Sequence, residues 1–127
     1  MTADAELVSI IMPTYNCGAF IAETIATVQE QTHSQWELLV VDDCSTDNTA
    51  EVVGALVEDD PRIRYVRLET NCGAATARNR AMELARGRYM AFLDSDDLWH
   101  PSKLRRQIDF MTSRGVAMSC TAYAQID

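Results

Sequence analysis

Short apolar runs alternate with longer amphipathic segments along this chain. The runs are rich in β-branched or aromatic residues and predict strands, because a strand buried in a parallel sheet reads as a continuous apolar stretch. The segments between them place apolar residues at helical spacing, as in Phe20, Ile21, Ile25 and Val28. The expected strands are 7–12, 37–41, 63–68, 89–93 and 116–122, and the expected helices are 19–31, 48–58, 74–86 and 101–114.

This alternation predicts an α/β fold. Strand–helix–strand units form parallel sheets with right-handed crossovers, which place helices on both faces of the sheet. We therefore expect an open, Rossmann-like parallel sheet, with the run at 89–93 inside the protein. The sequence contains no linker and no low-complexity tract, so residues 1–127 are interpreted as a single domain, and as an incomplete one because its sheet is half built.

The composition is that of an ordinary globular domain. The chain has 127 residues, of which 47% are apolar and 24% charged, and its net charge of −8 argues against a nucleic-acid partner. No segment approaches the roughly 20 apolar residues needed to cross a bilayer, and the acidic N-terminus carries no signal-peptide pattern. We expect a cytoplasmic protein, with peripheral attachment to a membrane as an alternative. The cysteines at 17, 44, 72 and 120 show no metal-ligand spacing and are expected to be reduced thiols.

Acidic residues follow two of the expected strands. Asp94, Asp96 and Asp97 come directly after 89–93, and Asp43 comes after 37–41. The carboxyl edge of an open α/β sheet is where ligands bind. Neighbouring carboxylates repel unless a cation lies between them, and Mg²⁺ and Mn²⁺ prefer carboxylate and phosphate oxygens. The pattern indicates metal-assisted binding of a phosphorylated ligand, with an acidic, solvated loop that caps the next helix as the alternative.

Other residues at this edge admit both a ligand-binding and a structural interpretation. Tyr15 can stack on a nucleobase or cover the rim of the core. Asp43 can accept a hydrogen bond from a base or a ribose, and we favour ligand contact. Arg78 can approach a diphosphate from the start of the third helix, or it can be a solvated surface group. Ser45 and Asp47 are expected to cap the second helix.

Several common catalytic patterns are missing from the sequence. It contains neither a GxGxxG nor a Walker A segment, and no Ser–His–Asp or Cys–His arrangement stands out. We expect His33 at the surface. His100 is expected to flank the fourth helix as a structural residue, with metal ligation as the less favoured alternative.

Taken in order, these segments resemble the family-2 glycosyltransferases, a large group of inverting enzymes with the GT-A nucleotide-diphosphosugar transferase fold. The resemblance covers nearly the whole chain, and the ordered set of motifs is more specific than any one of them. It is carried by VSIIMPTYN at 8–16, QT at 31–32, VDDCSTD at 41–47, NCG at 71–73, ARN at 77–79, ARG at 85–87 and FLDSDD at 92–97.

The resemblance implies a GT-A type sheet whose first four strands are ordered 3-2-1-4. It implies that Pro13 and Tyr15 flank the base of a nucleotide and that Asp43 bonds to it. Asp96 and Asp97 match the acidic motif that holds the ribose and the Mn²⁺ or Mg²⁺ bridging the diphosphate. In this family the general base and the acceptor-binding region come from a later part of the domain, so no catalytic base is assigned here.

The leading hypothesis is the donor-binding part of an inverting glycosyltransferase that acts in cell-surface polysaccharide biosynthesis. It would bind a nucleotide-diphosphate sugar, with UDP as the favoured nucleotide, for transfer to a hydroxyl of a carbohydrate or lipid-linked acceptor. Two alternatives remain. One is a nucleotide-sugar-binding module without transfer activity. The other is a truncated domain that forms a homo-oligomer through 116–126 and any exposed part of 89–93.

Overall fold

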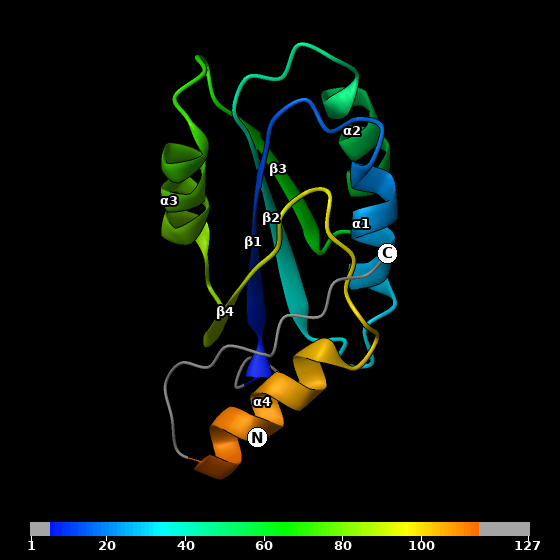
Figure 1. Ribbon diagram of the computed structural model, residues 1–127, viewed down its shortest axis with the longest axis vertical. Coiled ribbons are helices and arrows are strands. Elements are labelled where there is room, and N and C mark those ends of the chain that lie inside the picture. The colour runs from blue at the N-terminus through cyan, green and yellow to red at the C-terminus, as the bar shows by residue number, and fades with distance from the viewer. Residues whose placement is uncertain (1–5, 115–127) are drawn as a thin grey trace.

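The computed structural model describes residues 6–114, which form a four-stranded parallel sheet with helices on both faces (Figure 1). The expected strand 116–122, Cys120 and the proposed contact segment 116–126 lie outside these residues. Every other expected strand and helix is present with its ends shifted by no more than two residues: β1 (Val8–Thr14), α1 (Ile21–Gln29), β2 (Trp36–Asp42), α2 (Thr49–Asp59), β3 (Ile63–Arg67), α3 (Ala74–Leu84), β4 (Tyr89–Phe92) and α4 (Lys103–Arg114).

The strand order is β3-β2-β1-β4, and every neighbouring pair is parallel. This confirms the predicted order 3-2-1-4. The chain winds outward from β1 to β2 and β3, and then returns to place β4 on the other side of β1. The direction of winding therefore reverses at β1, and open α/β sheets bind ligands beside such a reversal, beyond the carboxyl ends of the strands.

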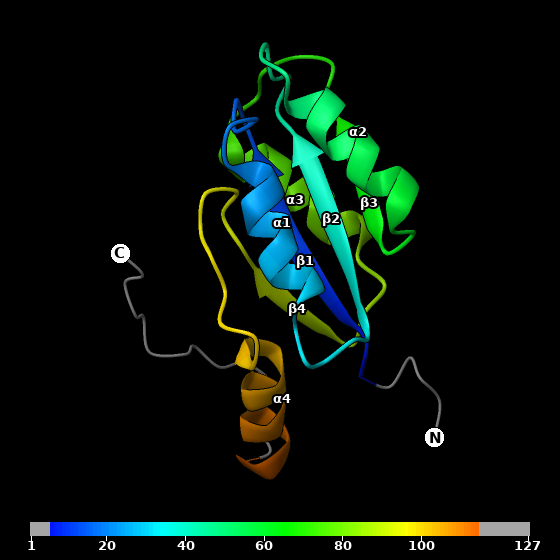
Figure 2. The same cartoon turned by 90° about the vertical axis from the view of Figure 1, so that its right-hand side faces the viewer.

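The central strands β1 and β2 bury both of their faces, which explains their continuous apolar sequences. On one face Ile10 and Leu38 belong to a core that also contains side chains of α1, α2 and α4. Figure 2 shows α1 and α2 in front of the sheet, on this face. On the other face Ile11, Leu39 and Val41 pack against Ala77 and Ala81 of α3. The small side chains of α3 bring this helix close to the sheet.

The edge strand β4 is only half buried, so the prediction that the whole run 89–93 lies inside the protein is wrong. Leu93 is buried, but Met90 and Phe92 are 46% and 53% exposed. Phe92 pairs in register with Ile11, on the face of the sheet where α3 packs. An outer strand has a neighbouring strand on one side only, and α3 packs against β1 and β2 instead of β4.

A buried carboxylate anchors the end of the sheet opposite the carboxyl edge. Glu37 accepts hydrogen bonds from Ser9 Oγ at 2.6 Å and from the Arg86 backbone N–H at 2.7 Å. The guanidinium groups of Arg64 and Arg86 lie 3.5 and 3.4 Å from Oε1. Burial raises the pKa of Glu37, but the bonds from Ser9 and Arg86 outweigh this effect and hold the pKa below its ordinary value.

The glycine in the ARG motif fits against this anchor. The Gly87 N–H donates to Ser9 Oγ at 2.8 Å. A Cβ atom at this position would lie 2.7 Å from both Leu7 O and Ser9 Oγ, closer than packed atoms approach. The ARG motif therefore has a structural explanation, because any side chain here would separate β4 from β1.

His33 is buried, contrary to the expectation that it lies at the surface. Arg105 Nη2 lies 2.9 Å from His33 Nδ1, and since a guanidinium only donates, Nδ1 accepts and the proton resides on Nε2. Nε2 then donates to the backbone oxygen of Glu6 at 2.8 Å. These partners are a backbone group and a residue far along the chain, so no local sequence pattern marks His33 as buried.

Among residues 6–114, no helix is both long and apolar enough to span a bilayer.

Candidate functional site

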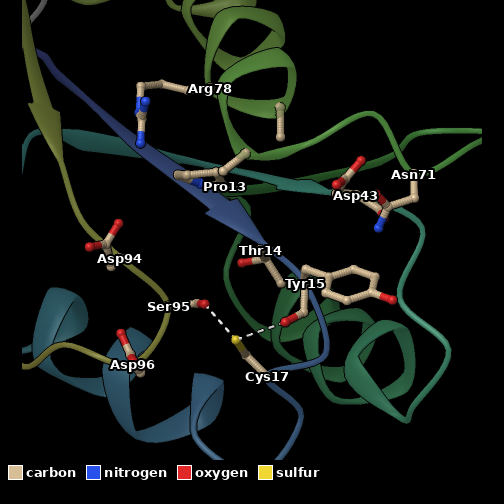
Figure 3. Close-up of a pocket in the computed structure, with 12 residues that line it drawn as sticks. Pro13, Thr14, Tyr15, Cys17, Asp43, Asn71, Arg78, Asp94, Ser95 and Asp96 are labelled. Atoms are coloured by element: carbon tan, nitrogen blue, oxygen red, sulfur yellow. Dashed lines mark hydrogen bonds between the residues drawn. The ribbon is translucent and has the colours of Figure 1, made fainter.

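A cavity of about 450 Å³ opens at the carboxyl ends of the strands (Figure 3). This volume lies within the range of about 300–1,000 Å³ that is typical of small-molecule sites. The end of β1, the loops after β2 and β4, and the first turns of α3 contribute its walls. Five of the six predicted site residues line it, namely Pro13, Tyr15, Asp43, Arg78 and Asp96, whereas Asp97 lies in the adjoining loop outside the lining.

Asp43 fixes the loop that leads into α3. Its carboxylate accepts the backbone N–H groups of Cys72 at 2.6 Å and Gly73 at 2.8 Å, and its backbone oxygen accepts Asn71 Nδ2 at 3.2 Å. Gly73 adopts a φ of +96°, a conformation that favours glycine. The expected contact of Asp43 with a ligand therefore competes with, or adds to, a structural role, because each carboxylate oxygen can accept a second hydrogen bond.

Asp42 is fully buried next to Asp43 and is satisfied by protein groups. It accepts hydrogen bonds from the backbone and hydroxyl of Ser45 and from the hydroxyl of Tyr65. Burial, followed by the hydrogen bond to Asp42 and then the charge of Asp42, raises the pKa of Tyr65 well above its ordinary value. Ser45 thus bonds to Asp42 and does not cap α2 as predicted, whereas Asp47 accepts the N–H of Thr49 at the start of α2.

The loop that carries Tyr15 is joined to the loop before α2. Asn16 has a φ of +51°, and its side-chain oxygen accepts the backbone N–H groups of Thr46 at 2.8 Å and Asp47 at 3.3 Å. The Cys17 N–H donates to Thr49 Oγ1 at 3.1 Å. These bonds hold the loop while Tyr15 remains 46% exposed at the rim of the cavity.

The acidic loop after β4 concentrates negative charge at the other end of the cavity. The Asp97 N–H donates to the backbone oxygen of Asp94 at 3.1 Å, which closes a turn. Burial, followed by the charges of Asp94 and Asp96, raises the pKa of Asp97. The next helix, α4, begins only at Lys103, so the alternative that this loop caps it is wrong.

The donor chemistry of this loop fits a hard divalent cation, but the protein alone does not enclose one. Within the part of the chain that the structure describes, no three Asp, Glu, His or Cys side chains are grouped closely enough to hold a metal ion. The pKa of Asp97 is raised by burial and then by the neighbouring charges of Asp94 and Asp96. Mg²⁺ is commonly bound by one or two carboxylates together with phosphate oxygens of a ligand, and this loop can supply that share.

Arg78 lies across the cavity from Asp94 (Figure 3). It comes from the second turn of α3 and is half buried, without an ion-pair partner among residues 6–114. Its neighbour Arg80, in contrast, is paired with Glu83 at 3.9 Å on the outer face of the helix. An unpaired guanidinium that faces a cavity is suited to a phosphate or a carboxylate.

Comparison with known proteins decides the family. The chain matches the model of glycosyl transferase family 2 over residues 9–127. This chain belongs to glycosyltransferase family 2. It is 46% identical over 124 residues to the UDP-Glc:alpha-D-GlcNAc-diphosphoundecaprenol beta-1,3-glucosyltransferase WfgD of Escherichia coli, a match that covers 98% of this chain and 48% of WfgD. The chain spans about half the length of the curated relatives it matches.

Solved structures show the same fold. S. aureus TarS in complex with UDP-GlcNAc superposes with a TM-score of 0.79 at 33% identity, covering 85% of this chain and 32% of TarS. The mannosyltransferase PcManGT of Pyrobaculum calidifontis, in complex with GDP-Man and Mn²⁺, gives a TM-score of 0.77 at 31% identity, covering 82% of this chain and 32% of PcManGT. The sheet is therefore that of the GT-A glycosyltransferases.

Several residues of this family-2 site were not predicted from the sequence. The clearest is Thr14, which is 3% exposed and lines the cavity with a hydroxyl that has no hydrogen-bond partner in the described structure. A buried hydroxyl of this kind calls for a ligand or water partner. Its position next to Pro13 in the VSIIMPTYN motif is the signal that could have found it. The others are Asn71 and Ser95.

Proposed function

We propose that this domain is the sugar-donor site of an inverting glycosyltransferase and binds a nucleotide-diphosphate sugar together with Mn²⁺ or Mg²⁺. One observation carries the proposal: a single cavity has Tyr15 and Asp43 at one end and the acidic loop and Arg78 at the other (Figure 3). A nucleoside diphosphate has the same polarity, with an aromatic base at one end and charged phosphates at the other.

The base and ribose would occupy the part of the cavity near Tyr15. The exposed ring of Tyr15 and the neighbouring Pro13 offer flat surfaces for stacking. Asp43 and Asn71 supply polar atoms for the edge of the base, and the unpartnered hydroxyl of Thr14 lies on the floor between the two ends. UDP is the favoured nucleotide because TarS is seen with UDP-GlcNAc, although PcManGT is seen with GDP-Man.

The diphosphate would lie between Arg78 and the acidic loop. Asp96 lines the cavity and is proposed to contact the ribose and the metal, and Asp97 is proposed as a second metal ligand. A bound divalent cation would act as a Lewis acid that stabilises the leaving nucleoside diphosphate. Arg78 would add positive charge on the opposite side.

The acceptor is proposed to be a hydroxyl of a carbohydrate or of a lipid-linked sugar. The name of WfgD specifies an acceptor linked to diphosphoundecaprenol, which supports a lipid-linked acceptor and a position beside a membrane. We assign no catalytic base to residues 6–114, and such a base typically contributes about 10²–10⁴-fold in rate. A nucleotide-sugar-binding module without transfer activity therefore remains the second candidate for this chain on its own.

Calorimetric titration of the chain with UDP, GDP and ADP, each with Mn²⁺ and again with EDTA, tests the proposal. We expect one nucleotide to bind and Mn²⁺ to increase its affinity. Release of the nucleoside diphosphate from its sugar conjugate, measured with and without an acceptor, then separates a transferase from a binding module. Equal and negligible heats for all three nucleotides in Mn²⁺ would contradict the proposal.

Replacing Tyr15 by alanine is expected to weaken nucleotide binding about ten-fold, because stacking of one base on an aromatic ring is worth about 1–3 kcal/mol. The loss should be equal with Mn²⁺ and with EDTA, since Tyr15 lies away from the acidic loop. Phe20→Ala is the matched control, because Phe20 is 56% exposed and does not line the cavity. Full affinity in Tyr15→Ala would place the base elsewhere.

We also propose that the chain self-associates through β4. Met90 and Phe92 form an exposed apolar pair on an edge strand, and such edges favour pairing with another chain. Sedimentation equilibrium is expected to show a dimer or larger assembly that Met90→Lys combined with Phe92→Lys converts to monomer. A wild-type monomer at high concentration would refute this.

A further inference from the structure

The acidic loop is attached to helix α1 as well as to the sheet. The last hydrogen bond to the sheet before the acidic loop runs from the Leu93 N–H to the backbone oxygen of Ile11, at 3.0 Å. Beyond that point Ser95 is buried between the exposed Asp94 and Asp96. The backbone oxygen of Ser95 accepts the hydroxyl of Thr24, a residue of α1 that is 1% exposed, at 2.9 Å.

The same face of α1, together with Gln31 just beyond the end of this helix, holds the chain that follows the loop. Thr27 Oγ1 accepts the N–H of Trp99 at 3.2 Å. Gln31 Nε2 donates to the backbone oxygen of His100 at 2.7 Å, and Gln31 Oε1 accepts the N–H of Leu104 at 3.1 Å. Thr24 and Thr27 are three residues apart, the spacing of one helix face, and Gln31 lies just beyond α1, which ends at Gln29. This accounts for Gln31 in the QT motif, which the donor site itself does not use.

A second contact connects the acidic loop to the loop that carries Tyr15. The hydroxyl of Ser95 lies 2.8 Å from the sulfur of Cys17, and the Cys17 thiol donates to the backbone oxygen of Tyr15 at 3.2 Å (Figure 3). A chain of hydrogen bonds therefore runs from Thr24 through Ser95 and Cys17 to Tyr15. It links the proposed metal end of the cavity with the proposed base end.

We propose that Thr24 is a positioning residue that fixes the acidic loop before nucleotide and metal arrive. Its hydroxyl holds the backbone oxygen of Ser95, and that bond determines where the carboxylates of Asp96 and Asp97 lie. Groups held in place beforehand bind a ligand without the cost of ordering them. This inference rests on the proposed donor site, because positioning matters only if these carboxylates bind a metal–diphosphate.

The first test needs no ligand. Thr24→Val keeps the shape of the side chain and removes the hydroxyl, and Thr24→Ser restores the hydroxyl. Ser9→Ala is the control, because Ser9 is equally buried and its hydroxyl bonds to Glu37 at the opposite end of the sheet. We expect the Asp97 amide to exchange with deuterium about ten-fold faster in Thr24→Val, the size of effect for one lost hydrogen bond, and at the wild-type rate in the other two.

Unchanged exchange of Asp97 in Thr24→Val would overturn the proposal, as would an equal increase across β2, which would indicate general loosening. The second test measures UDP affinity with Mn²⁺ and with EDTA. In Thr24→Val, the increase in UDP affinity that Mn²⁺ provides is expected to be about ten-fold smaller than in the wild type, while the affinity measured in EDTA stays the same. Thr24→Ser is expected to behave like the wild type in both conditions. A full gain in Thr24→Val would also overturn it. A wild-type chain without any such gain would refute the donor site itself, an outcome distinguishable because the exchange measurement needs no nucleotide.

Discussion

Replacing Asp97 by asparagine is expected to remove most of the nucleotide affinity that Mn²⁺ adds, about 100-fold, and to raise the melting temperature of the metal-free chain. Both effects come from removing the negative charge of Asp97. Burial and the charges of Asp94 and Asp96 raise the pKa of Asp97, so its ionised form is unfavourable in the folded chain. A carboxyl whose pKa is raised by folding lowers stability at every pH above its unfolded pKa, and asparagine removes that cost.

Calorimetry with UDP in Mn²⁺ and in EDTA, together with thermal unfolding in EDTA, measures the two effects. Asp59→Asn serves as the control, because Asp59 is exposed at the end of α2 and its loss changes the net charge equally. Alanine at position 97 should weaken Mn²⁺-dependent binding in the same way. Equal losses of affinity with and without Mn²⁺ would exclude Asp97 as a metal ligand, and a lower melting temperature in EDTA would show that its charge is balanced within the protein.

Replacing Glu37 by alanine is expected to lower the free energy of unfolding by about 3 kcal/mol, because hydrogen bonds to a buried charged group are worth about 1.5–3 kcal/mol each and their donors are left unpaired. The donors are Ser9 Oγ and the Arg86 N–H. Denaturation by guanidinium chloride at neutral pH measures the loss. Glu58→Ala is the control, since Glu58 lies exposed on α2.

The carboxylate of Glu37 also makes the free energy of unfolding depend on pH. The folded-state pKa of Glu37 is lowered, so its ionised form contributes stability that is fully present above the unfolded pKa of about 4.3. That contribution is lost as the pH falls through the lowered folded-state pKa. We expect the difference in unfolding free energy between wild type and Glu37→Gln to shrink in this acidic range. A difference that stays constant down to pH 2 would show that the charge of Glu37 contributes nothing.

The sequence predicted the sheet well because its signals are local or topological. Apolar periodicity located the strands and helices, and the ordered motifs of the family gave the order that β3-β2-β1-β4 confirms. The half exposure of Met90 and Phe92 was missed because an apolar run does not reveal whether its strand has one neighbour or two. His33 was missed because two of its partners, Glu6 and Arg105, are far away in sequence.

In the candidate site, too, some features could be predicted from the sequence and others could not. Positions just past a strand were predictable, and Tyr15, Asp43 and Asp96 all line one cavity. Hydrogen-bond partners were harder to predict. The Ser45 hydroxyl could accept an N–H of α2 or donate to Asp42, and in the structure it donates to Asp42. Thr24 was not marked, since a threonine on a helix shows no sequence sign of bonding a loop about 70 residues further along the chain.

Asp43 holds the loop before α3 through backbone groups, and this determines which positions of the loop tolerate substitution. The Asp43 carboxylate accepts the backbone N–H groups of Cys72 and Gly73, so these hydrogen bonds do not depend on which side chain occupies position 72. Gly73 is constrained by its positive φ, and Asn71 by the bond from its side chain to the backbone oxygen of Asp43. Position 72 can therefore vary while the loop keeps its course beside Asn71, which faces the cavity. A random library at position 72 is a direct test of whether this loop sets the nucleobase that the proposed donor site accepts.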